Sequence, residues 1–156
     1  MRELDSTDLR LLSLLQYDCK LSNKELADKL GITATPVLLR KRKLEELGYI
    51  KQYIAVVDRN KVDLSLVAFT NVQLSVHSTE AMAIFEKKMM ELREVQECHH
   101  LTGSYDYLLK IVLKDMNAYH HFIRDKLAPL PNIKTLQSSF VMTEVKMEMS
   151  YILPDQ

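Results

Sequence analysis

The stretch TATPVLLRKRKLEELG, Thr33 to Gly48, decides the interpretation of the N-terminal third of this 156-residue chain. Thr33 is a good helix cap, Pro36 is tolerated in a first turn, and Gly48 can end a helix in the left-handed conformation. Between them, Arg40–Lys43 are four consecutive cations. We therefore predict a helix over residues 33–47 and interpret it as one that enters the major groove of DNA.

Upstream, two further helices are predicted at about 5–17 and 22–30. All three helices begin with a hydrophobic staple. In this motif an apolar residue comes directly before the polar cap, and a second apolar residue lies four positions after the cap. These triplets are Leu4-Asp5-Leu9, Leu21-Ser22-Leu26 and Ile32-Thr33-Val37. Ser22 and Glu25 have the spacing of a capping box. Because only Gly31-Ile32 separates the second helix from the third, the two helices must cross steeply, which indicates a helix-turn-helix.

Downstream, residues 49–57 alternate and are rich in β-formers, which predicts a strand that serves as a short wing or linker. A domain boundary is expected near residue 60. The predicted domains are residues 1–60, a DNA-binding unit, and residues 61–156, a second domain.

In the second domain the hydrophobic period changes. Alternation predicts strands at 68–76, 95–101, 107–113 and 135–151. Helices are predicted after the caps Ser78 and Asp115, and Pro129 and Pro131 end the second one. The order βαββαβ is the ferredoxin-like arrangement, so the whole chain is predicted to be α+β. Both helices should cover one face of the sheet, and the apolar residues on the other face lead us to expect a homodimer that pairs sheets.

Composition agrees with a soluble DNA-binding protein. Net charge is zero, with 47% hydrophobic and 27% charged residues, but residues 33–43 carry cations and no acid. Such a local basic patch fits DNA binding through one small surface. No apolar run long enough for a membrane span and no signal peptide is recognised. Cys19 and Cys98 are interpreted as free thiols, and the protein is expected in the cytoplasm.

Four segments resemble the leucine-responsive/asparagine-responsive regulator (Lrp/AsnC) family of prokaryotic transcription factors. They are LDSTDLRLLSLLQYD, LSNKELADKLGITATPVLLRKRKLEELGYIKQY, VQECHHLTGSYDYLLKIVLKDMNAY and FVMTEVK. The resemblance implies an N-terminal winged helix-turn-helix that binds DNA and a C-terminal ferredoxin-like domain that dimerises, assembles dimers further and binds an amino acid between dimers. Lys41 departs from the family, in which an aliphatic residue is common at this position.

The candidate DNA-binding residues lie on the third predicted helix. They are Thr33, Ala34, Thr35, Pro36, Leu39, Arg40, Lys41, Arg42 and Lys43. The first turn offers amides and hydroxyls to phosphate, an arginine can read a guanine edge or clamp phosphate, and lysines suit phosphate. Taken alone, the basic run would more often be a solvated helix face. A dimer of such units predicts a pseudo-palindromic operator.

The candidate effector residues are Thr102, Gly103, Ser104, Tyr105 and Asp106, with Ser138 and Ser139 added by family resemblance from a partner dimer. Asp106 could accept from the ammonium of an amino acid, and loop amides beside Gly103 could bind its carboxylate. The alternative is a tight hairpin turn with Asp106 as a local cap. Met116 and Phe140 could line an apolar pocket that favours leucine or methionine, or could both be core. No other cofactor is expected.

Three alternatives concern a metal site, an architectural DNA-binding protein and an enzyme. Neither Cys98-His99-His100 nor His120-His121 has chelating geometry, because adjacent residues point to different sides, so no metal is expected. An architectural DNA-binding protein without an effector would keep the helix-turn-helix and discard the loop. A sirohaem-decarboxylase-like enzyme would not need a basic recognition helix, and no nucleophile–base spacing is visible. Assembly of the dimers to a tetramer or octamer is expected from the resemblance.

Overall fold

The computed structural model describes residues 4–154, which cluster into two compact units. One unit contains the described residues up to Val56 together with those from Lys146 onward, and the other is Val57–Val145. The predicted division was 1–60 and 61–156. The structure differs from it chiefly in the last residues, which cluster with the N-terminal unit. Among the described residues, no helix has the length and apolar character needed to cross a membrane.

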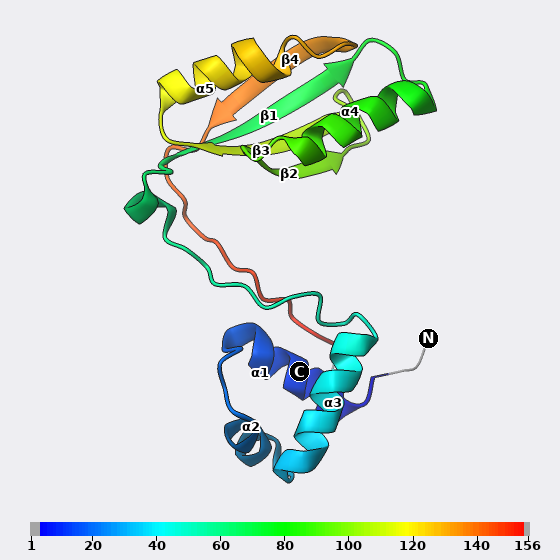
Figure 1. Cartoon of the computed structure of the whole chain (residues 1–156), viewed down its shortest axis with the longest axis vertical. Coiled ribbons are helices and arrows are strands. Elements are labelled where there is room, and N and C mark those ends of the chain that lie inside the picture. The colour runs from blue at the N-terminus through cyan, green and yellow to red at the C-terminus, as the bar shows by residue number, and fades with distance from the viewer. Residues whose placement is uncertain (1–3, 155–156) are drawn as a thin grey trace. The chain divides into compact units, whose positions relative to one another are not determined.

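The N-terminal unit contains α1 (Ser6–Tyr17), α2 (Asn23–Leu30) and α3 (Ala34–Glu46), drawn from blue to cyan in Figure 1. Ser22 and Glu25 form the predicted capping box, and Gly31 ends α2 with φ 71°. Thr33 occupies the cap position of α3, although its hydroxyl makes no capping hydrogen bond. The helices meet in a core of buried aliphatic residues: Leu11, Leu15, Leu26, Ala27, Leu30, Val37 and Leu44.

The strand predicted over residues 49–57 is wrong for the single chain, since residues 51–58 have no regular secondary structure. Tyr49 and Ile50 both donate their amides to the carbonyl of Leu44, which closes α3 rather than starting a ladder. Farther on, Val56 and Val57 are each 62% exposed. Alternating apolar and polar residues show only that the side chains suit a strand. A strand also needs a neighbouring strand that donates and accepts backbone hydrogen bonds.

The C-terminal unit has the predicted βαββαβ order (Figure 1). After a 3-10 turn (Arg59–Val62), its elements are β1 (Leu66–Leu74), α4 (Thr79–Glu91), β2 (Val95–His100), β3 (Tyr107–Leu113), α5 (Met116–Phe122) and β4 (Ile133–Phe140). A π-helical turn, Ile123–Leu127, extends α5. The four strands form an antiparallel sheet in the order β2-β3-β1-β4. Ser78 and Asp115 cap the two helices as predicted.

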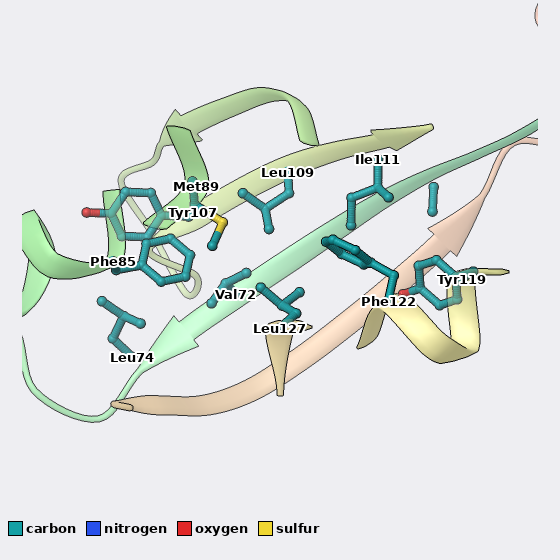
Figure 2. Close-up of a cluster of buried hydrophobic side chains, with 11 residues drawn as sticks. Val72, Leu74, Phe85, Met89, Tyr107, Leu109, Ile111, Tyr119, Phe122 and Leu127 are labelled. Atoms are coloured by element: carbon teal, nitrogen blue, oxygen red, sulfur yellow. The ribbon is translucent and has the colours of Figure 1, made fainter. Parts of the chain in front are cut away.

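Both helices cover the same face of the sheet, where their apolar side chains meet those of β1 and β3 (Figure 2). The buried members labelled in Figure 2 are Val72, Leu74, Phe85, Met89, Tyr107, Leu109, Ile111, Tyr119, Phe122 and Leu127. Two apolar residues next to this core are exposed instead, Val76 to 54% and Met116 to 53%. Val76 lies beyond the end of β1, and Met116 is the first residue of α5.

The final predicted strand is also shorter than expected. β4 ends at Phe140, and the alternating residues from Val145 to Tyr151 are exposed and form no strand. Within the N-terminal unit the tail is tied to α1 instead. The amide of Tyr151 donates to Gln16 Oε1 (2.8 Å), and Gln16 Nε2 donates to the carbonyl of Tyr151 (3.3 Å).

Neither α4 nor α5 covers the opposite face of the sheet, which is mixed in character. Phe69 pairs with Lys110 across β1 and β3, so the two share this face, and Phe69 is 36% exposed. On the same face, Glu97 accepts from Lys110 Nζ at 2.7 Å and lies 3.1 Å from His99 Nε2. Those two partners hold the pKa of Glu97 below its usual value, Lys110 having the larger effect. This face therefore combines apolar surface with a fixed charge cluster.

Candidate functional site

The first turn of α3 is an exposed helix N-terminus without any acidic residue. Its predicted phosphate-contacting residues, Thr33, Ala34, Thr35 and Pro36, are all exposed, and Leu39 on the next turn is 60% exposed. Unsatisfied amides and the positive end of the helix dipole make such a terminus suitable for an anion. The structure thus brings these five predicted residues onto an accessible end and side of one helix.

The four cations of α3 have different environments. Arg40 Nη1 lies 2.6 Å from Asp5 Oδ2 and 2.6 Å from Asp8 Oδ1, and Lys43 Nζ lies 3.3 Å from Asp8 Oδ2. Asp8 is fully buried. The hydrogen bonds to Asp8 and then Asp5 raise the pKa of Arg40. Arg40 and Lys43 therefore join α3 to the start of α1.

Asp8 has a second structural role, because it also closes a capping box at the start of α1. Its amide donates to Asp5 Oδ1 at 2.7 Å, and the amide of Asp5 donates to Asp8 Oδ2 at 3.4 Å. The bond from the Asp8 amide is the largest cause of the lowered pKa of Asp5, with Arg40 adding to it. The spacing Asp-x-x-Asp was a visible signal for this box, and the sequence interpretation did not use it.

Arg42 is exposed and forms no side-chain hydrogen bond or ion pair with any described residue. Two positions along a helix correspond to a rotation of roughly 200°, so Arg42 points away from the side on which Arg40 meets α1. Of the two arginines predicted to contact DNA, the structure leaves the guanidinium of Arg42 available.

Lys41 is half-buried and lies over an aromatic ring. Its Nζ is 4.9 Å from the centroid of the Tyr53 ring, and the Tyr53 hydroxyl donates to Glu45 Oε1 at 2.7 Å. Lys41 was predicted to contact phosphate, and that contact stays a prediction. The role of Tyr53 was not foreseen.

The candidate effector loop joins β2 to β3. Thr102, Gly103 and Ser104 are exposed at its tip, and Gly103 has φ 126°, a conformation that side chains rarely adopt. The loop is closed by the amide of Leu101, which donates to the carbonyl of Asp106 at 2.7 Å. The predicted loop residues therefore lie together on an accessible hairpin.

The carboxylate of Asp106 fastens this loop to the end of β1. Oδ2 accepts from the amide of Leu74 at 2.7 Å, and Oδ1 lies 2.9 Å from His77 Nε2. The Asp106 amide also donates to the carbonyl of Val72. The contact with Leu74 spans 32 residues of sequence, so it is a long-range anchor of the loop and differs from the local turn cap that the sequence left open as an alternative. Binding of an effector ammonium by Asp106 stays a prediction.

Ser138 and Ser139 are adjacent on β4 and thus lie on opposite faces of the sheet. Ser138 lies on the helix side, where its hydroxyl meets Thr70 Oγ1 at 2.9 Å and accepts from the Tyr119 hydroxyl. Ser139 pairs with Phe69 on the open face. The two serines do not form one site within a single chain.

A groove of about 410 Å³ lies beside the effector loop, between α4 and β2. His100 and Tyr107, which flank the loop in sequence, both line it. Its other lining residues are Glu86, Met89, Met90, Val95, Gln96 and Cys98. Neither Met116 nor Phe140, the residues predicted to line an apolar pocket, belongs to it. Phe140 instead packs edge-on against Tyr119, with ring centroids 4.9 Å apart.

The cysteines and histidines are the residues of this chain that could ligate a transition metal. Cys19 and Cys98 are free, and burial raises the pKa of Cys98 to about 11. Within residues 4–154, no three histidine, cysteine or acidic side chains gather in an arrangement that could hold a metal ion.

Two sequence profiles match the chain. One, described as winged helix-turn-helix DNA-binding, matches residues 4–51, and the other, described as Lrp/AsnC ligand binding domain, matches residues 67–151. The chain is 37% identical to the leucine-responsive regulatory protein of Klebsiella pneumoniae, covering 93% of this chain and 88% of that protein. It is 36% identical to the Bkd operon transcriptional regulator of Pseudomonas aeruginosa, covering 93% and 95%.

Solved structures agree with the sequence relatives. A transcriptional regulator of Neisseria meningitidis in complex with L-Met superposes with a TM-score of 0.93 at 36% identity, covering 97% of this chain and 98% of that one. An AsnC family transcriptional regulator of Agrobacterium tumefaciens gives a TM-score of 0.91 at 32% identity, covering 96% and 97%.

Proposed function

The chain belongs to the Lrp/AsnC family of transcriptional regulators, and from that premise we propose which of its surfaces bind DNA, bind the effector and pair two copies. It is a DNA-binding regulator with a ligand-binding domain that responds to an amino acid, and it is not an enzyme. The L-Met complex of the Neisseria relative supports an effector-responsive regulator over a purely architectural protein. Since the protein acts on chromosomal DNA, we expect it in the cytoplasm.

The proposed DNA-binding surface is the N-terminal half of α3. The observation that carries this proposal is the exposed, acid-free first turn together with the exposed guanidinium of Arg42, which pairs with no residue that the structure describes. Residues 33–36 would contact phosphate through amides and hydroxyls, and Leu39 could touch a thymine methyl. Arg42 would read a guanine edge or clamp phosphate. Arg40 and Lys43 would hold the position of α3 through their ion pairs with Asp5 and Asp8 at the start of α1.

The proposed dimer interface is the open face of the sheet. Phe69 and the Glu97–Lys110–His99 cluster give this face both an apolar centre and a charge pattern, features that favour self-pairing in one register. A two-fold dimer of this kind would present two recognition helices to a pseudo-palindromic operator. We propose that dimers assemble further, to a tetramer or octamer.

Replacing Phe69 by aspartate is expected to weaken this pairing, because a carboxylate would be buried in the interface without a partner. Light scattering after size exclusion should show a shift to smaller species. The matched control is Ile84→Asp, which places the same charge at an exposed residue of α4, 60% exposed, and should leave the mass unchanged. An unchanged mass for Phe69→Asp in a folded protein would exclude this face.

The proposed effector site is the tip of the loop at residues 102–106, beside the groove between α4 and β2. Amides near Gly103 would bind the carboxylate of an amino acid, because glycine lets a ligand approach the backbone. The groove offers the thioethers of Met89 and Met90 and the side chain of Val95 to an apolar side chain. By family resemblance, a partner dimer would add polar groups from the Ser138–Ser139 segment of its fourth strand. Leucine or methionine is proposed, and the L-Met complex of the relative supports the latter choice.

Effector binding is expected to raise the melting temperature in a thermal-shift screen of the amino acids. At a concentration of about 100 times Kd, a ligand that binds only the folded protein adds roughly 2.7 kcal/mol of stability. Leucine or methionine should give the largest shift, and aspartate or lysine none. Calorimetric titration then gives the stoichiometry. A flat screen, with protein that binds DNA, would contradict the effector site and leave the DNA-binding proposal standing.

Three substitutions around Asp106 separate loop anchoring from effector binding. Asp106→Ala leaves the buried Leu74 amide without an acceptor, so it should cost about 1–3 kcal/mol of stability. Asp106→Asn keeps an acceptor but removes the negative charge. His77→Ala removes a partner that is 56% exposed and should cost less than about 1 kcal/mol. These differences can be measured by urea denaturation.

The asparagine variant is the informative one for ligand binding. A stable Asp106→Asn protein that no longer binds the amino acid would support a direct contact with the ammonium. If it binds normally while Asp106→Ala is destabilised, Asp106 acts only as the anchor of the loop.

A further inference from the structure

Tyr53 lies in a segment without regular secondary structure, yet its side chain contacts α3 twice. Its hydroxyl donates to Glu45 Oε1 at 2.7 Å, and its ring lies under Lys41 Nζ, 4.9 Å from the centroid. Lys41 and Glu45 are four positions apart, so they lie one above the other on the same helix face. Burial, and then the bond to Glu45, raises the pKa of Tyr53. Lys41, Glu45 and Tyr53 are called the linker clasp below.

We propose that the linker clasp fixes the point at which the linker leaves the DNA-binding unit, and thereby sets the half-site spacing that the dimer accepts. Lys41 is then a positioning residue that does not contact phosphate. This inference rests on the proposed function, since it assumes two recognition helices that bind one operator. It gives a role to the lysine that departs from the family pattern.

The clasp changes the length of the free linker. Before Tyr53, the last residue packed on the core is Ile50, and Lys51 and Gln52 are exposed. The linker ends at Asp58, whose carboxylate accepts from the amide of Asn60 and caps the first turn of the C-terminal unit. With the clasp closed, the free segment is Ile54–Val57. With it open, the free segment begins at Lys51.

An extended chain reaches at most about 3.3–3.6 Å per residue, so opening the clasp adds roughly 10 Å to the linker of each protomer. Along B-DNA the rise is about 3.4 Å per base pair. One opened clasp therefore gives its recognition helix a freedom equivalent to about three base pairs. A closed clasp should discriminate against operators whose half-sites are misplaced by that amount.

A second connection is the C-terminal tail, which hydrogen bonds hold to the N-terminal unit, and it is longer than the linker of the closed clasp. Glu144 is held to Arg59 within the C-terminal unit, at 3.4 Å. Tyr151 is held to Gln16 within the N-terminal unit. The free segment between them, 145–150, is longer than Ile54–Val57. While the clasp is closed, the linker is thus the shorter of the two connections. With the clasp open, the linker is one residue longer than the tail, so the full extension also requires the exposed hydrogen bonds between Tyr151 and Gln16 to open, at a cost of about 0.5–1.5 kcal/mol each.

The competing role for Lys41 is a phosphate contact, and the two roles differ in their dependence on salt. A lost phosphate contact weakens binding to all operators alike and lowers the salt slope of log K by about one. A lost clasp leaves the salt slope unchanged and relaxes the spacing preference. The two effects can be measured on one set of variants.

The test uses the full-length protein and duplexes in which the half-site separation of a selected operator is changed by three base pairs in either direction. Binding is followed by fluorescence anisotropy at several salt concentrations. The variants are Lys41→Met, which keeps the apolar stem, Tyr53→Leu, and Lys41→Arg, whose guanidinium can also lie over the ring. Lys51→Met is the matched control, because it removes the same charge from an exposed residue outside the clasp.

The wild-type protein and Lys51→Met should lose at least about tenfold in affinity on the altered operators. Lys41→Met and Tyr53→Leu should lose less than about threefold in affinity on the same altered operators, with the salt slope of the wild type. Lys41→Arg should keep the wild-type discrimination between operator spacings. Tyr53→Phe keeps the ring and loses only the bond to Glu45, so its loss of affinity on the altered operators should lie between those of the wild type and Tyr53→Leu. It replaces Tyr53→Leu in the test if that variant does not fold.

Two results would overturn the inference. One is wild-type spacing discrimination in Lys41→Met and Tyr53→Leu, and the other is a salt slope lowered by about one in Lys41→Met. Wild-type protein that selects no operator at all would instead overturn the proposed function.

Discussion

Replacing Arg40 by alanine is expected to lower the free energy of unfolding of the N-terminal unit by about 3 kcal/mol. The substitution leaves the fully buried carboxylate of Asp8 without its closest cation. Removing one partner of a buried ion pair typically costs about 3–5 kcal/mol. The lower end applies because the Arg40 side chain is 29% exposed and Lys43 remains 3.3 Å from Asp8. Urea denaturation followed by circular dichroism measures the change.

The matched control for this prediction is Arg42→Ala, which removes the same group from the same helix. Because Arg42 is exposed and pairs with no described residue, its loss should change stability by less than about 0.5 kcal/mol. A double variant, Asp8→Leu with Arg40→Met, removes both charges and should recover much of the lost stability. If Arg40→Ala melts like the wild type but loses DNA binding, Arg40 contacts DNA and the assignment is reversed.

The second large effect concerns DNA. Arg42→Ala is expected to weaken binding to a selected operator by at least about 30-fold while the protein stays folded. One arginine that contacts a guanine contributes about 1–3 kcal/mol, and a dimer loses two such contacts. Even the smaller value, doubled to about 2 kcal/mol, corresponds to that factor. Anisotropy with the operator and with an unrelated duplex separates the loss of specificity from a general loss of charge.

Lys51→Ala is the charge-matched control for Arg42→Ala, because Lys51 lies outside α3 and is exposed. It should change affinity by less than about threefold. Equal losses in Arg42→Ala and Lys51→Ala would indicate general electrostatics, and the proposed role of Arg42 would then be wrong.

Local rules explain the parts of the fold that could be predicted. Ser22 with Glu25, Ser78 and Asp115 cap helices by bonds within three residues, and such bonds depend little on the rest of the chain. Gly31 takes the left-handed conformation that a tight turn between helices requires. The alternation at 68–76 and 107–113 correctly predicted β1 and β3, although Val76 lies beyond the end of β1.

The errors arise where a second segment decides the outcome. Residues 49–57 and 145–151 alternate like strands, but no neighbouring strand is available to them within the described chain. Ser138 and Ser139 were assigned to the effector site of a partner dimer by family resemblance, and the structure adds that they lie on opposite faces of the sheet. The contact of Asp106 with the amide of Leu74 at the end of β1 was not visible in the sequence either, and binding of an effector by Asp106 stays a prediction.

The sequence by itself determined the helix-turn-helix and the order of helices and strands in the C-terminal unit, because these depend on local spacing, caps and turns, and its resemblance to known regulators identified the family. It also determined that Arg40 and Lys43 share one helix face, since they are three residues apart. Only the tertiary structure decided which face packs against α1, and hence that Arg40 neutralises a buried Asp8 while Arg42 pairs with no residue of 4–154. Burial depends on residues far apart in the chain, so the sequence of a basic run does not show which carboxylates will lie beside it in the fold.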